Sequence, residues 1–312
     1  MHADMDRRSF LVALAAMGAI TRAPSALTLP PQRTRLILLG TGGGPRPRTG
    51  SMPSAQVIIA DGKLYVVDCG DGVARQLVLA GASLDALRHV FITHHHSDHN
   101  ADYGNLLLLS WASGLGHRVD TWGPPPIERI TRLFFEMSAY DMDVRIADEG
   151  RTPLVPLVHV HEFSEPGIVM QDESVKVTSA LVDHPLVKPA FAYRFDAADR
   201  SIVISGDTAR SDNLIRLAQG ADVLVHEALF PAAVDRLVAR VPSAAALRPH
   251  LFAAHTAIED VGRVAAAAGV KTLVLSHFVP ADDAVTTEQM WADAAALHFS
   301  GRIIVGRDLM EI

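Results

Sequence analysis

Residues 93–100, Thr-His-His-His-Ser-Asp-His-Asn, are the densest group of potential metal ligands in the chain. They follow a β-branched and aromatic run that predicts a strand, so they lie where that strand ends. In an extended segment residues i and i+2 point to the same side, so His94 and His96 can hold one ion while Asp98 and His99 reach a second. Without a cation, three imidazoles and a carboxylate this close together would repel and desolvate one another. This cost favours a metal site over a polar loop.

The same residue types recur further along the chain, each time where an apolar run stops. Strand ends are where a scaffold presents side chains for binding and catalysis. Taken singly, each could be an ordinary structural polar residue, but together with the first cluster they predict one shared site. The terminations are Asp183-His184, Gly206-Asp207, His226-Glu227 and Ser276-His277.

Three further features each allow two interpretations. Asp68, at the end of a predicted strand over residues 63–68, either orients a ligand histidine or caps a turn. The Gly-rich segment 40–48 is either a tight turn or a loop on the substrate side, where its arginines would add positive charge. His159 and His161 face one side of a predicted strand, and with no carboxylate at the adjacent spacing we interpret them as a strand face or pocket wall.

These stretches, in this order, resemble the metallo-β-lactamase-fold hydrolases, and within them the branch of RNase Z and the microbial arylsulfatases. The resemblance implies an α/β fold, a four-layer αββα sandwich with a dinuclear site at one edge of the two sheets, over residues 34–312. It rests on Gly40-Thr41-Gly42-Gly43, Asp68-Cys69-Gly70-Asp71-Gly72, the His94 to His99 cluster, Asp183-His184, Ser205-Gly206-Asp207-Thr208, His226-Glu227-Ala228, His255-Thr256-Ala257 and Leu275-Ser276-His277-Phe278.

The resemblance also implies a ligand set for two zinc ions. Two ions that share a carboxylate can lower the pKa of a water far enough to supply hydroxide near neutrality. The implied ligands are His94, His96 and His184 for one ion, Asp98, His99 and His277 for the other, and Asp207 as the bridge between them.

Catalysis is expected from His255, Glu227 and Asp98. By the resemblance, His255 would stabilise negative charge in the transition state, and Glu227 would orient it through a hydrogen bond. The other interpretation of His255 is structural, since it stands ahead of a predicted helix where Thr256 and Glu259 would form a capping box. The two roles are compatible.

The substrate is expected to be a small anionic ester, a phosphodiester or an aryl sulfate, and not nucleic acid. A formal net charge of −7 disfavours binding of a long polyanion. Members that process tRNA insert a flexible arm between the positions of His184 and Asp207, whereas here 22 residues separate them. Two alternatives remain, a lactone, thioester or β-lactam hydrolase of the same fold and a non-catalytic metal-binding protein. The oligomeric state is left open, with a homodimer among the options.

The first 26 residues read as a twin-arginine export signal. Arg7-Arg8 is followed by the apolar run 11–20 and then by the small residues of 23–26. This run has about half of the roughly 20 residues needed to cross a bilayer, so no stable membrane span is expected. The protein is expected to be periplasmic or secreted, and with Cys69 as its single cysteine it has no internal disulfide.

Overall fold

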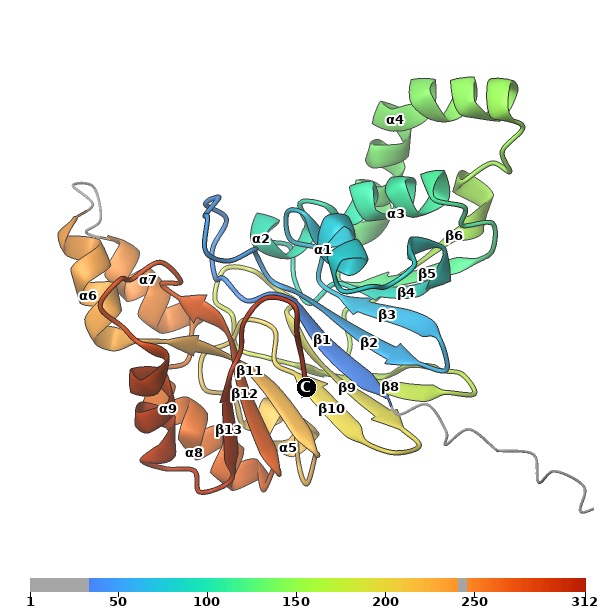
Figure 1. The fold of residues 1–312 in the computed structure, drawn as a ribbon. Helices are drawn as coiled ribbons and strands as arrows, with labels where there is room; N and C mark the ends of the chain where they lie inside the picture. Colours follow the sequence, from blue (N-terminus) through green and yellow to red (C-terminus); the bar gives the residue numbers. More distant parts are fainter. Residues whose placement is uncertain (1–33, 241–245) are drawn as a thin grey trace, which may run out of the picture. The chain divides into compact units, whose positions relative to one another are not determined.

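Two seven-stranded sheets lie face to face in the computed structural model, which describes residues 34–240 and 246–312 (Figure 1). The first sheet has the order β14-β1-β2-β3-β4-β5-β6 and the second the order β13-β12-β11-β10-β9-β8-β7. The strands are β1 Arg35–Gly40, β2 Ala55–Ala60, β3 Lys63–Val67, β4 Leu87–Phe91, β5 Val119–Gly123, β6 Val158–Glu162, β7 Gly167–Gln171, β8 Val175–Leu181, β9 Phe191–Ala197, β10 Ser201–Ile204, β11 Val223–Leu229, β12 Thr272–Val279, β13 Arg302–Val305 and β14 Met310–Glu311.

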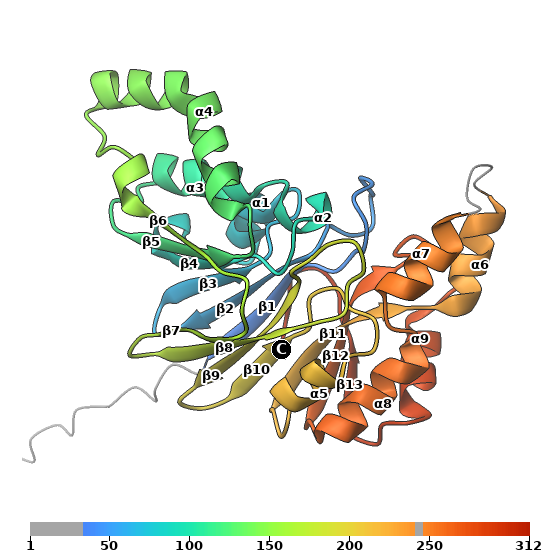
Figure 2. The same ribbon diagram turned by 180° about the vertical axis from the view of Figure 1, so that it is seen from behind.

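Helices cover the outer face of each sheet. Figures 1 and 2 show α1, α3 and α4 on the side of the first sheet and α5, α8 and α9 on the side of the second. Among the described residues, no helix is both long enough and apolar enough to cross a membrane. The helices are α1 Val73–Leu79, α2 Ser97–Asn100, α3 Tyr103–Ala112, α4 Ile127–Glu149, α5 Asp212–Leu217, α6 Pro231–Ala239, α7 Leu247–Ala254, α8 Ile258–Ala268 and α9 Glu288–Ala296, with short 3-10 turns at Leu84–Ala86 and Val155–Leu157.

Three hydrophobic clusters define the layers. Successive side chains of a strand point to opposite faces, so a strand that is covered on both faces is apolar throughout. In β1, Leu36 and Leu38 pack between the sheets, whereas Ile37 and Leu39 pack against the helices of the first sheet. A third cluster joins the second sheet to α5, α8 and α9. The expected four-layer αββα sandwich is thereby confirmed.

Two strands of the second sheet continue past the points where we expected them to end. β11 runs on through His226 and Glu227 to Leu229, and β12 runs through His277 to Val279. The register between them shifts after Glu227, and His277 adopts a left-handed backbone conformation with φ 44°. Such a bulge re-aims a side chain without ending the strand, so His277 is presented to the site from inside a strand.

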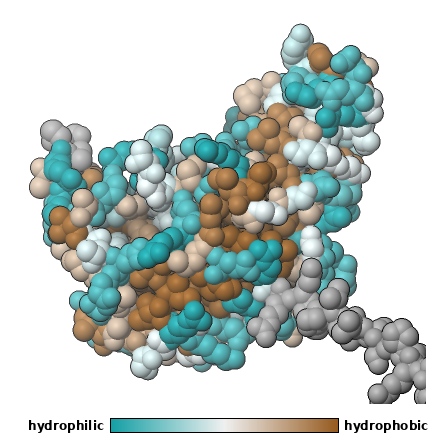
Figure 3. Space-filling view, in the orientation of Figure 1, coloured by the Kyte–Doolittle hydropathy of each residue, from teal (hydrophilic) through white to brown (hydrophobic). Residues whose placement is uncertain are grey.

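Helix α4, with 23 residues, is the longest helix of the described residues. It continues to Glu149 and ends at Gly150, whose φ of 68° is the usual left-handed helix end. In its last turns Arg145 pairs with Asp141 and with Glu149, one turn away on either side. In Figure 3 the surface over this part of α4 is mainly hydrophilic. Hydrophobic side chains gather nearer the middle of the molecular face in view.

The predicted export signal, residues 1–26, lies within residues 1–33, which are outside the described residues. The structure therefore does not test the signal, and the export interpretation stays a prediction.

We predict that Gly262→Ala destabilises the protein although alanine favours helix. A Cβ at Gly262, in α8, would lie 2.3 Å from the carbonyl oxygen of Ala295 in α9, so the two helices would have to separate. Overpacking of this kind typically costs about 1–3 kcal/mol, which urea unfolding would detect as a lower free energy of unfolding. Gly116→Ala is the matched control, because its Cβ would meet nothing closer than 3.9 Å. Equal stability of both variants would contradict the prediction.

Candidate dinuclear metal site

The structure brings all the expected ligand residues together at one edge of the two sheets. They come from the loop between β4 and α2, from α2 itself, from the loops after β8 and β10, and from the bulge in β12. Within each group the potential ligand atoms lie within 4.8 Å of one another. The first group is His94, His96, His184 and Asp207, and the second is Asp98, His99, Asp207 and His277.

Asp68 orients two of these histidines, one of them through Thr93. Its Oδ2 lies 2.7 Å from Nδ1 of His99, and it also accepts hydrogen bonds from the backbone N–H and hydroxyl of Thr93. Because the Thr93 hydroxyl proton is used on Asp68, its oxygen accepts from Nδ1–H of His94, 3.0 Å away. Both rings therefore carry their proton on Nδ1 and turn Nε2 toward the cluster. Of the two interpretations of Asp68, orientation of ligand histidines fits the structure.

The imidazoles of the first group have the geometry of a ligand set. Nδ1 of His184 donates to the carbonyl oxygen of Ala254 at 3.1 Å, so its Nε2 offers a lone pair to the cluster. Nδ1 of His96 lies 3.1 Å from Nε2 of His94 and 3.1 Å from Nε2 of His184. With metal–nitrogen bonds of about 2.0–2.1 Å, tetrahedral ligand atoms are roughly 3.3 Å apart, so these two spacings are close to those of a zinc site.

Asp207 faces both groups at once. Its Oδ1 lies 3.3 Å from Nε2 of His99 and 3.2 Å from Nε2 of His277, while its Oδ2 lies 3.8 Å from Nε2 of His94. Oδ1 is buried and accepts no hydrogen bond from the described residues. A buried carboxylate oxygen without a hydrogen bond is costly unless a cation pairs with it. One oxygen toward each group is the arrangement of a bridging ligand.

Charge at the site is balanced between carboxylates and imidazoles. Burial alone would raise the pKa of Asp98 and of Asp207, but His99 and His277 outweigh it and hold both pKa values below the usual range. Burial lowers the pKa of His184 to about 4, so its ring is neutral near pH 7 and able to ligate. Around His99, burial is outweighed by Asp207, Asp68 and Asp98, which raise its pKa. The carboxylates thus attract a cation to this place, and protons and metal ions compete for it.

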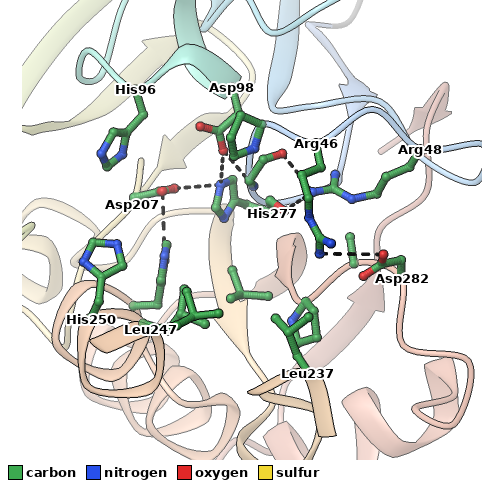
Figure 4. Close-up of a pocket in the computed structure, with 18 of the residues that line it drawn as sticks. Arg46, Arg48, His96, Asp98, Asp207, Leu237, Leu247, His250, His277 and Asp282 are labelled. Atoms are coloured by element: carbon green, nitrogen blue, oxygen red, sulfur yellow. Dashed lines mark hydrogen bonds and ion pairs between the residues drawn. The ribbon is translucent and has the colours of Figure 1, made fainter. Parts of the chain in front are cut away.

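The Gly-rich segment is part of the site, which supports the second interpretation of residues 40–48. The backbone N–H of Gly44 donates to Oδ2 of Asp98 at 2.7 Å and fixes that carboxylate. A Cβ at Gly43 would lie 2.8 Å from the ring of His277, so only glycine lets the loop come this close. Figure 4 shows Arg46 and Arg48 extending from this loop beside His277 and Asp98.

His255 lies beside the ligand groups, at the C-terminal end of α7. Its Nδ1 is 3.5 Å from Oε2 of Glu227 and 3.9 Å from Oδ2 of Asp207. Burial works against the charged ring, but these two carboxylates outweigh it and raise the pKa of His255 to about 9. His255 is therefore an imidazolium at neutral pH, a donor suited to an anionic transition state. Its contact with Glu227 is an ion pair, longer than the hydrogen bond we expected.

Glu227 is held in place by the backbone instead. Its Oε1 accepts from the N–H of Thr256 at 2.7 Å. The Thr256 hydroxyl donates to the carbonyl oxygen of Thr208, and α8 begins only at Ile258, with no side-chain cap. The predicted capping box of Thr256 and Glu259 is therefore wrong, because the buried Thr256 is used to join the two loops that carry Asp207 and His255. Thr93, Thr208 and Ala254 were not predicted as parts of the site; only their positions next to predicted residues pointed to them.

His159 and His161 lie on β6, at the edge of the first sheet, and belong to none of the ligand groups. The ring of His161 stacks on Trp122 at 3.8 Å, and its Nε2 lies 2.6 Å from Oδ1 of Asp120. The interpretation of His159 and His161 as part of a strand face is confirmed.

A cavity of about 490 Å³ opens onto the ligand groups (Figure 4). His96, Asp98, Asp207, His255 and His277 line it, so the site can be reached from outside the sandwich. A volume of this size suits a small ligand or one part of a larger one.

Comparison with known proteins identifies the family. Residues 64–278, more than half of the chain, match the family described as Beta-lactamase superfamily domain. The chain belongs to this superfamily. Ribonuclease Z of Mycobacterium bovis is 32% identical to it over 280 residues, which cover 89% of this chain and 97% of that protein. Ribonuclease Z of Mycobacterium avium is 33% identical over 278 residues, covering 88% and 96%. These relatives place the chain in the RNase Z branch.

Solved structures agree on the fold. Human tRNase Z, short form, superimposes with a TM-score of 0.66 at 21% identity, covering 89% of this chain and 98% of that one. The metallo-β-lactamase fold protein YhfI of Bacillus subtilis gives a TM-score of 0.66 at 20% identity, covering 89% and 98%. At such identities these structures show the fold alone. Together with the sequence relatives and the ligand groups, they make this superfamily member a metal-dependent hydrolase, a phosphodiesterase.

The prediction that nucleic acid is excluded as a partner is wrong. It is overturned by relatives that are named ribonuclease Z and align with this chain over nearly their whole length. The net charge of −7 describes the whole chain, whereas binding depends on the local field, and Arg46 and Arg48 line the cavity itself. The segment between His184 and Asp207 does form only the β9–β10 hairpin, but the absence of an arm does not remove the catalytic cavity.

We predict that the zinc-loaded protein holds about two zinc ions per chain, because the ligand set exceeds what one tetrahedral ion can use. Asp207→Ala should lower zinc affinity by more than the roughly 10–100-fold typical of losing an outer hydrogen-bond partner, since it removes a ligand from both groups. Metal analysis and zinc titration would measure both effects. Asp183→Ala, an exposed carboxylate beside His184, is the control. Full activity with a single bound ion would contradict the dinuclear arrangement.

Proposed function

We propose that this protein uses two zinc ions to hydrolyse phosphodiester bonds of RNA. The observation that carries the proposal is the buried pair of His255 and Glu227 beside Asp207, which keeps a cationic donor next to two ligand groups. Supporting it, the curated relatives that match the chain along its length are named ribonuclease Z.

The ligand side chains would hold the ions and fix their separation. When bound, two zinc ions would supply hydroxide near neutral pH and neutralise the charge of the ester. Asp207 spans both groups, and Asp98, fixed by the N–H of Gly44, turns its carboxylate toward the cavity. The Nδ1–H of His99 stays on Asp68, so that ring keeps one orientation.

His255 would act on the phosphoryl group. Its Nδ1 faces Glu227 and Asp207, which leaves Nε2–H to donate to a non-bridging oxygen as negative charge accumulates there. Glu227 favours the charged ring and holds its plane, while the N–H of Thr256 holds Glu227. Such a donor suits a phosphoryl group, whose transition state carries negative charge on several oxygens.

A panel of substrates tests this assignment. The purified zinc-loaded protein is expected to hydrolyse an RNA oligonucleotide and bis(4-nitrophenyl) phosphate. An aryl sulfate, a lactone and a β-lactam represent the sulfatase and carbonyl alternatives. Preferred turnover of the lactone or the β-lactam over every phosphodiester would replace the proposed chemistry, and turnover of none with zinc bound would favour a non-catalytic metal-binding protein.

We predict that His255→Ala lowers kcat on the best phosphodiester by roughly a hundredfold to a thousandfold while zinc content stays unchanged, because one transition-state donor is lost. Glu227→Gln should give a smaller loss of the same kind. Since Glu227 acts through His255, the double variant should be little worse than His255→Ala alone. Steady-state kinetics and metal analysis on the three variants measure this.

His250→Ala is the matched control for that series. His250 is an exposed imidazole that lines the same cavity but, unlike His255, makes no ion pair with a carboxylate among the described residues, so its loss should change kcat far less. Additive losses in the double variant would show that Glu227 does not act through His255. Normal turnover by His255→Ala with two zinc ions bound would remove the proposed role of His255.

We further propose that the protein is exported, on the pattern of residues 7–26 alone. Arg7→Lys combined with Arg8→Lys should keep the precursor inside the cell, because the export receptor reads the planar guanidinium pair and lysine preserves only the charge. Cell fractionation and immunoblotting measure the distribution. The same substitutions at Arg35 and Arg88, which lie beyond the pattern, serve as control. Normal export of the Arg7–Arg8 variant would mean that this pair is not the signal.

A further inference from the structure

Arg46 lines the catalytic cavity and makes only weak contacts with the rest of the protein described here (Figure 4). Among the described residues its one ionic partner is Asp282, at 3.9 Å, and the two side chains are 62% and 48% exposed. A loose surface pair of this kind contributes little to stability. Arg48, from the same loop, is different, because it donates to the carbonyl oxygens of Gly43 and Gly44 and holds the loop in shape. Arg46 is thus available to an anion that enters the cavity.

A second cavity adjoins the first at this point. It has a volume of about 740 Å³ and lies between residues 47–51 and residues 281–284. Arg48, Ala281 and Asp282 line both cavities. A substrate too long for the first cavity can therefore continue past the Arg46–Asp282 pair into the second.

The charges along this path favour an anion. Asp283 borders the second cavity, but its carboxylate is only 3% exposed and is paired with Arg236 at 2.6 Å, so its charge is compensated. The groups that remain are Arg46, Arg48 and Asp282, two cations and one anion. The path is locally positive although the chain as a whole is acidic.

The opposite wall of the first cavity is apolar apart from the imidazole of His250. Leu237 of α6 and Leu247 and Leu251 of α7 line it, and Figure 4 shows Leu237 and Leu247 across the cavity from Asp98. These side chains suit a base or another apolar substituent and offer nothing to a phosphate. The permanent charge of Arg46 therefore favours a second phosphate on its side of the cavity, where the opposite wall offers only the imidazole of His250.

We propose that Arg46 is a specificity-determining residue that binds a second phosphate of the substrate, adjacent to the phosphodiester being cleaved. Asp282 competes with that phosphate for the guanidinium. The inference rests on the proposed function and adds a substrate class, a nucleotide strand with at least two phosphodiesters. A planar guanidinium binds a phosphate through two parallel N–H donors, which makes arginine suited to this role.

The test compares UpU, which has one phosphodiester, with UpUpU, which has two, on the zinc-loaded full chain. The wild-type protein should hydrolyse UpUpU with the higher kcat/KM. Arg46→Ala should lower kcat/KM for UpUpU by about tenfold, mainly through KM, the loss expected for a hydrogen bond to a charged group. Its effect on UpU and on bis(4-nitrophenyl) phosphate should be less than about twofold, because surface substitutions away from a bound group change little.

Two further measurements separate recognition from a structural effect. Asp282→Asn should raise kcat/KM for UpUpU severalfold, since it removes the competitor of the phosphate. For Arg46→Ala, the slope of log kcat/KM for UpUpU against log salt concentration should be shallower by about 0.7, the value for one lost phosphate contact on a single strand. Loss of loop structure alone would not produce these two changes together.

Arg132→Ala is the matched control, because Arg132 is 60% exposed and paired with Glu136 on α4, away from both cavities. Equal losses on UpU and UpUpU, no loss by Arg46→Ala, or the same loss in Arg132→Ala would overturn the role of Arg46. Hydrolysis of the small diesters with no advantage for UpUpU would overturn it and leave the proposed function standing. Failure to hydrolyse any phosphodiester would overturn both.

Discussion

The buried carboxylate of Asp207, with one oxygen toward each of two imidazole groups, is the interaction on which the rest of the site depends. Only 2% of this residue is exposed, and a buried charge is tolerated only when cations or hydrogen bonds compensate it. The imidazoles come from segments attached to both sheets, so the sandwich has to be assembled before they can meet around Asp207. Assembly of the fold and formation of the site are therefore one event.

Residues that hydrogen-bond to the ligand histidines keep the site in one geometry, although its ligands come from several separate segments. Asp68 fixes His99 directly and His94 through Thr93, while the carbonyl oxygen of Ala254 fixes His184. Each contact places the proton on Nδ1 and leaves Nε2 for the cluster. Such outer partners commonly matter almost as much as the ligands, because they set both the tautomer and the direction of the ring.

Backbone conformation contributes as well. Asp68 and His277 both have positive φ, 60° and 44°, a conformation that residues with a Cβ adopt at an energetic cost. Both lie at the site, one behind the ligands and one among them. The packing of the two sheets maintains this strain, and in return His277 faces Asp98 and Asp207 from inside a strand, while Gly43 leaves room for its ring.

The sequence by itself determined the residue types and the order of the fold. Alternating and continuous apolar runs indicated the strands of the αββα sandwich, and the spacing in His94 to His99 indicated two ions, because both follow from the local geometry of an extended chain. The far-separated ligands His184, Asp207 and His277 were assigned through a resemblance, since no local rule states which loops meet.

Only the tertiary structure decided how these residues face one another. It extended β11 and β12 past Glu227 and His277, used Thr256 to join two loops where a helix cap was expected, and made the Glu227–His255 contact an ion pair. It also decided between the two interpretations of the Gly-rich segment by placing Arg46 at the cavity, a local positive charge that the net charge of −7 does not reveal. Contacts between distant segments and local fields depend on three-dimensional packing, and composition averages over both.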